Sequence, residues 1–107
     1  MDRKLIDMKL YYVYILTNYA RTVLYTGITN NLERRLQEHS DEAKRRSKTF
    51  CGRYNVVYLL YYESYSVVTQ AIQREKEIKN LRRVKKEAMI HAFNPGWDFL
   101  NDRFMRL

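Results

Sequence analysis

Hydrophobic and aromatic residues first gather in Tyr11–Thr17 (YYVYILT), which has the aromatic and β-branched composition of a strand. A second segment of this kind, Thr22–Gly27, follows after the four residues 18–21. Such a short connection is typical of a hairpin turn, so we predict that the two strands are antiparallel. Because side chains alternate along a strand, one face of the first strand should carry Tyr12, Tyr14 and Leu16, and the other Tyr11, Val13 and Ile15.

The middle of the chain is predicted to hold a helix, a loop and a third strand. Leu32–Glu38 has helical composition, and Asn30 or Asn31 can serve as its N-cap. Ser40–Arg53 is polar and basic, which indicates a surface loop. Val56–Glu63 is apolar on both faces, so we expect a strand that is central in the sheet or well covered.

Two helices are predicted after the third strand. Ser66 can cap a helix over Val67–Lys79, and another helix over Val84–Phe93 should end at the sequence Asn-Pro-Gly of residues 94–96. Three large apolar residues follow, and we expect them to dock back onto the domain: Trp97, Phe99 and Leu100. The order β-β-α-β-α-α, with strands early and helices late, predicts an α+β fold.

The length and charge of the chain suggest one small domain with an anionic partner. A chain of 107 residues lies in the range of a single domain, which we expect to span residues 1–107. Lys and Arg number 20 against 12 Asp and Glu, so the net charge is +8. A polyanion such as nucleic acid is therefore the first partner to consider. Charge alone does not separate such a protein from any other soluble basic one.

Several other classes of protein are excluded by the composition. Cys51 is the single cysteine, so neither an internal disulfide nor a cysteine-based zinc cluster can form. The longest apolar run, Val56–Tyr62, is too short to cross a bilayer. The first residues lead into no apolar segment of a signal peptide. We therefore expect a soluble, cytoplasmic protein without a membrane partner.

Basic residues form two clusters along the chain, one within residues 44–53 and one within residues 74–86. Each could be an ordinary solvated surface. Two such clusters on a domain with tyrosine-rich strands favour a grip on the phosphate backbone, with affinity that depends on salt. The predicted nucleic-acid-binding residues are Arg34, Lys44, Arg45, Arg46, Lys48, Arg53, Lys79, Arg82 and Arg83.

Glu75 is out of place in the apolar pattern of its predicted helix. At roughly 100° per residue, Glu75 falls within the stripe formed by Val68, Ala71, Ile72 and Ile78. A carboxylate on an apolar face is costly unless it is paired, protonated or bound to a metal. A buried salt bridge to an arginine is the structural alternative.

Arg35 and His39 lie four residues apart and share one side of the first predicted helix. Together they could hold a phosphate, with Arg35 as a bidentate donor and His39 as a proton carrier. The structural alternatives are a hydrogen-bonded histidine at a helix end and an arginine stem packed on the sheet.

The ordered set Tyr12-Val13-Tyr14, Tyr25-Thr26-Gly27, Arg35 and Glu75 resembles the GIY-YIG nuclease superfamily. Five stretches are similar to the small single-domain bacterial members related to the N-terminal domain of the excinuclease UvrC: YYVYILTN, LYTGITNNLERRLQEH, VVYLLYYE, AIQREKEIKNLRRVKKEAMI and NPGWDFL. The resemblance runs from about residue 9 to residue 100. It implies a small three-stranded antiparallel sheet flanked by helices, and hydrolysis of DNA phosphodiester bonds with one Mg²⁺ or Mn²⁺ ion.

The resemblance also assigns roles to five residues. Tyr14 and Tyr25 match the tyrosines of the two motifs, and either could be the general base. Arg35 matches the arginine that contacts the scissile phosphate, and His39 matches a position that is His or Tyr in several members. Glu75 matches the single metal-binding glutamate.

This chain departs from the family pattern at three positions, namely Tyr12, Thr26 and Ile28. Ile28 stands where the UvrC-like members carry a lysine, and the loss of that cation could lower activity. Larger members usually owe target choice to an added domain, so a protein partner could supply it here.

The expected function is an endonuclease in DNA repair or recombination. The alternatives are a non-catalytic nucleic-acid-binding module and an interaction domain in which Glu75 is a structural pair.

Overall fold

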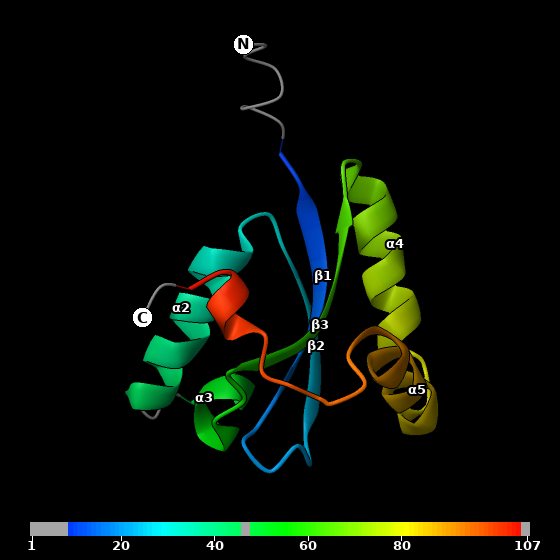
Figure 1. Cartoon of the computed structure of the whole chain (residues 1–107). Coiled ribbons are helices and arrows are strands. Elements are labelled where there is room, and N and C mark those ends of the chain that lie inside the picture. Colours follow the sequence, from blue (N-terminus) through cyan, green and yellow to red (C-terminus); the bar gives the residue numbers. More distant parts are fainter. Residues whose placement is uncertain (1–8, 46–47, 106–107) are drawn as a thin grey trace.

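The computed structural model describes residues 9–45 and 48–105 of the chain (Figure 1). Their elements in order are the strands β1 (Tyr11–Thr17) and β2 (Leu24–Thr29), the helices α2 (Leu32–Lys44) and α3 (Phe50–Tyr54), the strand β3 (Tyr58–Tyr65), the helices α4 (Val68–Lys79) and α5 (Arg83–Phe93), and the 3-10 turn η1 (Asn101–Arg103). The predicted α+β class and its order of strands and main helices are confirmed.

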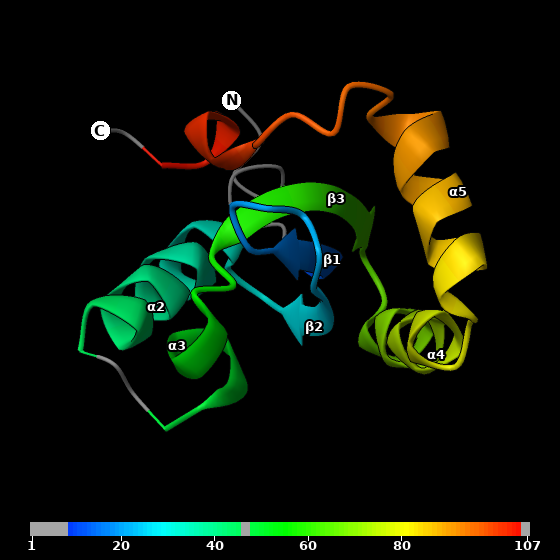
Figure 2. The same cartoon turned by 90° about the horizontal axis from the view of Figure 1, so that it is seen from below.

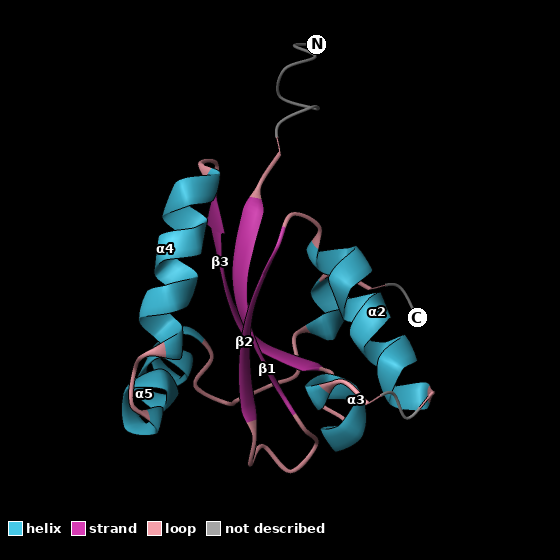
Figure 3. Cartoon of the chain, turned by 180° about the vertical axis from the view of Figure 1, so that it is seen from behind, coloured by secondary structure: helices cyan, strands magenta, loops and turns pink. Residues whose placement is uncertain are grey.

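The three strands form an antiparallel sheet in the order β2-β1-β3, with β1 in the centre. Tyr14 and Leu16 point to the face that α2 and α3 cover, while Val13 and Ile15 point to the face that α4 and α5 cover. The predicted alternation along β1 is therefore confirmed. Figure 2 shows the two groups of helices on either side of the sheet, and Figure 3 shows the same layers from behind.

The third strand was predicted to be central or well covered, and the second alternative holds. β3 lies at an edge of the sheet but is covered there. The chain after α5 crosses its free side, where Leu100 N donates to Leu59 O at 2.8 Å. Asn101 accepts from Leu59 N at 2.8 Å and donates to Val57 O at 2.9 Å. This cover, with helices on both faces, explains why an edge strand is apolar on both sides.

The segment predicted as a loop over Ser40–Arg53 is largely helical. Helix α2 continues through Lys44, and Thr49 caps the short helix α3 by accepting from Gly52 N at 3.1 Å. Of the two predicted caps of α2, Asn31 is the one used, since its side chain accepts from Arg34 N at 3.0 Å. Val67 rather than Ser66 is the N-cap of α4.

The apolar stripe predicted on α4 is only partly correct. Ala71 and Ile78 are fully buried against the sheet, whereas Val68 and Ile72 remain 40% and 42% exposed. The buried side of the helix is therefore rotated away from Val68 and Ile72. Glu75 lies at the border between these two sides, with 14% of its side chain exposed.

The predicted docking of the C-terminal apolar residues is confirmed. Leu100 is buried beside α2 and β3, while Trp97 and Phe99 pack on the other cluster. None of the helices in the described ranges is long and apolar enough to cross a membrane.

Candidate active site

Close contact between β1 and β2 brings the two motif tyrosines into one site. Tyr14 pairs with Gly27 across the strands, and its ring lies directly over the glycine. A Cβ atom at position 27 would lie 2.5 Å from both Cζ and Oη of Tyr14, closer than nonbonded atoms can approach. The glycine of the second motif is therefore required to make room for the tyrosine of the first.

The hydroxyl of Tyr14 shares a hydrogen bond of 3.0 Å with Nε2 of His39 on α2. Both side chains are 1% exposed. Tyr25 completes the arrangement from β2, because its ring centre lies 6.5 Å from that of Tyr14 and 5.7 Å from that of His39. We call these three residues and Arg35 the tyrosine–histidine cluster.

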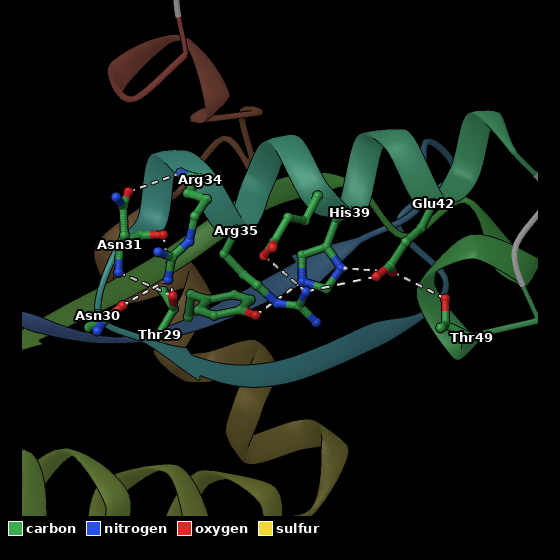
Figure 4. A network of polar contacts seen from close by, with 10 residues as sticks. Thr29, Asn30, Asn31, Arg34, Arg35, His39, Glu42 and Thr49 are labelled. Atoms are coloured by element: carbon green, nitrogen blue, oxygen red, sulfur yellow. Dashed lines mark hydrogen bonds and ion pairs between the residues drawn. The ribbon is translucent and has the colours of Figure 1, made fainter.

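Arg35 and His39 point to the same side of α2, as the sequence predicted (Figure 4). The guanidinium of Arg35 forms an ion pair of 3.3 Å with Glu38 and lies 3.8 Å from Glu42. About a third of the Arg35 side chain is exposed, so this cation can still meet a ligand. The helix therefore presents a cation beside the buried Tyr14–His39 pair.

Burial strongly affects the ionisation of the Tyr14–His39 pair. Burial, followed by the nearby Arg35 cation, lowers the pKa of His39 to about 4, although Glu42 and Glu38 raise it in part. Burial likewise raises the pKa of Tyr14, although the neighbouring Arg35 guanidinium lowers it in part. Both side chains are therefore neutral near pH 7.

The second ring nitrogen of His39 has an unusual environment. Nδ1 is buried and lacks a hydrogen-bond partner among the described residues. Oε2 of Glu42 lies 3.8 Å away, too far for a hydrogen bond but close enough to favour a proton on Nδ1. Glu42 also accepts from the Thr49 hydroxyl at 3.1 Å, which links α2 to the start of α3.

Glu75 stands apart from the cluster. It lies on α4, which covers the opposite face of the sheet, and its carboxylate pairs with Lys79 Nζ at 2.8 Å. Within the described residues no hydrogen bond, ion pair or ring contact joins Glu75 to the tyrosine–histidine cluster, and no group of three or more metal-ligating side chains exists. The structural alternative of a buried pair with an arginine is wrong, since the partner is a half-exposed lysine on the same helix.

The predicted nucleic-acid-binding cations are all exposed, apart from Arg46, which lies outside the described residues. Three have polar partners: Arg34 bonds Asn30, Lys79 pairs with Glu75, and Arg83 pairs with Glu87. The side chains of five others have no hydrogen bond or ion pair within the described part of the chain: Lys44, Arg45, Lys48, Arg53 and Arg82.

Two features of the site escaped the sequence analysis. Glu42 was not singled out, although its positions three residues after His39 and seven after Arg35 are a usable signal. Phe50 was not singled out either, although its ring stacks on Tyr25 with centres 6.2 Å apart. No periodic pattern in the sequence could predict this contact, because Phe50 on α3 and Tyr25 on β2 belong to separate elements.

The fold and the paired motif strands define a nuclease class. The sequence model of the GIY-YIG family, described as the GIY-YIG catalytic domain, matches residues 10–88. The chain belongs to the GIY-YIG nuclease family, whose members act on DNA and are generally dependent on divalent metal.

Within this family the chain is similar to UPF0213 proteins. It is 44% identical over 80 residues to one from Natronomonas pharaonis, covering 75% of this chain and 89% of the relative. It is 36% identical over 91 residues to one from Desulfotalea psychrophila, covering 85% of this chain and 80% of that relative. The solution NMR structure of a UPF0213 protein from Bacillus halodurans has 28% identity and a TM-score of 0.52, covering 82% of this chain and 89% of that one. The names of these relatives state no activity.

Proposed function

We propose that this protein is an endonuclease that hydrolyses DNA phosphodiester bonds with one Mg²⁺ or Mn²⁺ ion, in DNA repair or recombination. The observation that carries the proposal is the hydrogen bond between Tyr14 and neutral His39, with the Arg35 cation beside it. A site that hydrolyses a phosphodiester needs a proton acceptor and a cation for the charge that develops on phosphate. The tyrosine–histidine cluster contains both.

The donor chemistry at Glu75 fits a Mg²⁺ or Mn²⁺ ion. Magnesium usually binds through one or two carboxylates, with waters and substrate phosphates completing its shell. Glu75 offers one carboxylate, and its lysine partner is an exposed i,i+4 neighbour that contributes little stability. When bound, the ion would supply positive charge next to the phosphate. Glu75 would hold it.

Strand β2 lies between the helix that carries Arg35 and the helix that carries Glu75. It is an edge strand of the sheet in the described part of the chain, with α2 on one side and α4 on the other (Figure 2). We infer that the scissile phosphate lies along this edge, where Arg35 reaches it from α2 and Glu75 from α4. Arg35 would then orient the phosphate and neutralise charge on its oxygens.

The two tyrosines have different environments, which favour different roles. Tyr14 is fully buried and bonded to His39, so we assign it to holding the imidazole in place. Tyr25 is partly exposed, and we assign it to contact with the attacking water, whose proton it accepts only in its phenolate form. A proton on Nδ1 of His39, favoured by Glu42, leaves Nε2 free to accept from the Tyr14 hydroxyl.

A binding module without catalysis is the second candidate, and the Glu75–Lys79 ion pair favours it. In that case Lys79 neutralises the carboxylate, and the basic surface alone holds DNA. The two candidates make opposite predictions about cleavage, while both predict binding.

The test is cleavage of supercoiled plasmid, branched DNA and a single-stranded oligonucleotide with Mn²⁺ or with EDTA. The Glu75→Gln variant is compared with Glu87→Gln, which loses a similar i,i+4 ion pair on α5. We expect wild type and Glu87→Gln to cut only with metal, and Glu75→Gln to bind DNA but not to cut. If folded wild-type protein binds and cuts none of these substrates, the binding module replaces our proposal. If Glu75→Gln cuts DNA at the wild-type rate, the proposal that Glu75 binds the metal ion is contradicted.

A further inference from the structure

A row of three aromatic rings leads from the candidate site into solvent. Tyr25 belongs to the tyrosine–histidine cluster, and Phe50 stacks on it at an interplanar angle of 23°. Tyr54 follows, with its ring centre 5.0 Å from that of Phe50. Phe50 and Tyr54 are each 49% exposed. We call Tyr25, Phe50 and Tyr54 the aromatic row.

The outer two rings are held by a fixed element. Helix α3 begins at the Thr49 cap, and Thr49 also donates a hydrogen bond to Glu42 of α2. Cys51 anchors the helix in the core that contains Tyr14 and Leu36. The exposure of Phe50 and Tyr54 therefore comes from the way α3 is packed, and the Phe50 ring lies between Tyr25 and Tyr54 in the row.

Exposed basic residues lie close to the outer rings along the chain. The last turn of α2 and the segment through α3 supply Lys44, Arg45, Lys48 and Arg53, which are exposed. No carboxylate pairs with these four side chains in the described residues. Exposed aromatic rings next to cationic side chains without carboxylate partners suit a ligand that has both phosphate groups and flat apolar faces. A nucleic acid has both.

Exposed rings distinguish between forms of nucleic acid. In a duplex the flat faces of the bases are covered by their neighbours, so an aromatic side chain has little to stack on. In a single strand the faces are available, and aromatic rings next to a basic surface bind them without strong sequence preference. The aromatic row therefore fits unpaired bases.

We propose that the aromatic row stacks unpaired bases next to the scissile phosphate, so that the substrate of this site is single-stranded DNA. The proposal rests on the function proposed above, because it places the bound strand beside the tyrosine–histidine cluster. Tyr25 is the link, since it contacts both His39 and Phe50.

The test measures binding of a fluorescent oligo-dT and of a duplex of equal length, both in EDTA at fixed salt. We expect wild type to bind the single strand more tightly. Phe50→Ala and Phe50→Leu should each weaken single-strand binding about fivefold or more and duplex binding less than twofold. Phe50→Tyr keeps an aromatic ring and should bind the single strand as tightly as wild type does. Tyr19→Ala, which removes an exposed ring from the β1–β2 turn, is the matched control and should change neither. Phe50→Leu keeps an apolar side chain on α3 and guards against loss of folding.

Equal binding of duplex and single strand by wild type, or unchanged affinity in folded Phe50→Leu, would overturn the stacking proposal. Neither result depends on cleavage, because EDTA removes the metal. Selective single-strand binding lost in Phe50→Leu, in a protein that cuts nothing with Mn²⁺, would support the stacking and overturn the nuclease proposal. Metal-dependent cutting with no effect of Phe50→Leu on binding would overturn the stacking alone.

Discussion

At Gly27, one added methyl group would displace the side chain of Tyr14. A Cβ there overlaps the end of the tyrosine ring, which is the part bonded to His39. Gly27→Ala should therefore lower the free energy of unfolding by about 1–3 kcal/mol, as overpacking typically does, and abolish cleavage. Urea unfolding and plasmid nicking measure the two effects. The control is Gly96→Ala, whose Cβ would lie nearest to the carboxylate of Asp98, at 3.1 Å from Oδ1. Equal stability of the two variants would contradict this account.

His39 should make the stability of the fold depend on pH. Its pKa is about 4 in the folded chain, because of burial and Arg35, against about 6.5 when unfolded. The unfolded chain therefore binds the extra proton first, and stability falls as pH drops from 6.5 towards 4, by roughly 3 kcal/mol in all. Above pH 6.5 this contribution is fully present.

Unfolding by urea at several pH values between 4.5 and 7 measures this effect. In spite of burial, the hydrogen bonds from Arg74 and two tyrosines lower the pKa of Glu63, so its effect on stability falls at the acidic end of this range and below. His39→Gln should flatten the profile, while His91→Gln on α5 should leave it unchanged. An unchanged slope in His39→Gln would show that another group is responsible.

At the scale of the elements, a carboxylate joins α4 to the sheet. Glu63 of β3 accepts from Arg74 through Nε at 3.0 Å and Nη2 at 3.1 Å, and from the hydroxyls of Tyr61 and Tyr65. Burial raises the pKa of Glu63, but the hydrogen bonds from Arg74 and the two tyrosines lower it more. Arg74 precedes Glu75, so this contact also sets the position of the proposed metal ligand.

We expect Arg74→Met to lower the free energy of unfolding by about 2 kcal/mol, because hydrogen bonds to a charged group are lost. The matched control is Arg83→Met, which breaks the more exposed pair with Glu87 and should cost less than about 0.5 kcal/mol. Urea unfolding compares the two. Similar losses in both variants would mean that the Glu63–Arg74 contact contributes no more than a surface pair.

The elements also show what sequence patterns capture. The strand β1 was predicted with its correct bounds, because aromatic and β-branched residues fill six of its seven positions and Leu16 fills the other. The second half of α2 was missed because its polar residues were interpreted as a loop, although no Gly or Pro interrupts the helix. Helix α3 has five residues, too few for any helical period to appear.

At the scale of the whole molecule, the sequence could indicate candidate site residues but not the distances between them. Arg35 and His39 were predicted to share a side because helical spacing is local, and the structure agrees. Glu75 was predicted within an apolar stripe, but which side of α4 meets the sheet depends on tertiary packing. The contact of Phe50 with Tyr25 joins elements 25 residues apart, and only the fold brings them together.

The chain that crosses the free side of β3 has a consequence for association between molecules. Asn94 and Asn101 satisfy the backbone groups of Leu60, Leu59 and Val57, which would otherwise form an open strand edge. An open edge pairs readily with the same edge of another molecule. Replacing both asparagines by alanine should therefore make the protein self-associate as its concentration rises, which sedimentation velocity can measure against the unaltered chain. Concentration-independent sedimentation of the variant would contradict this. The last residues of the domain thus act against aggregation as well as completing its core.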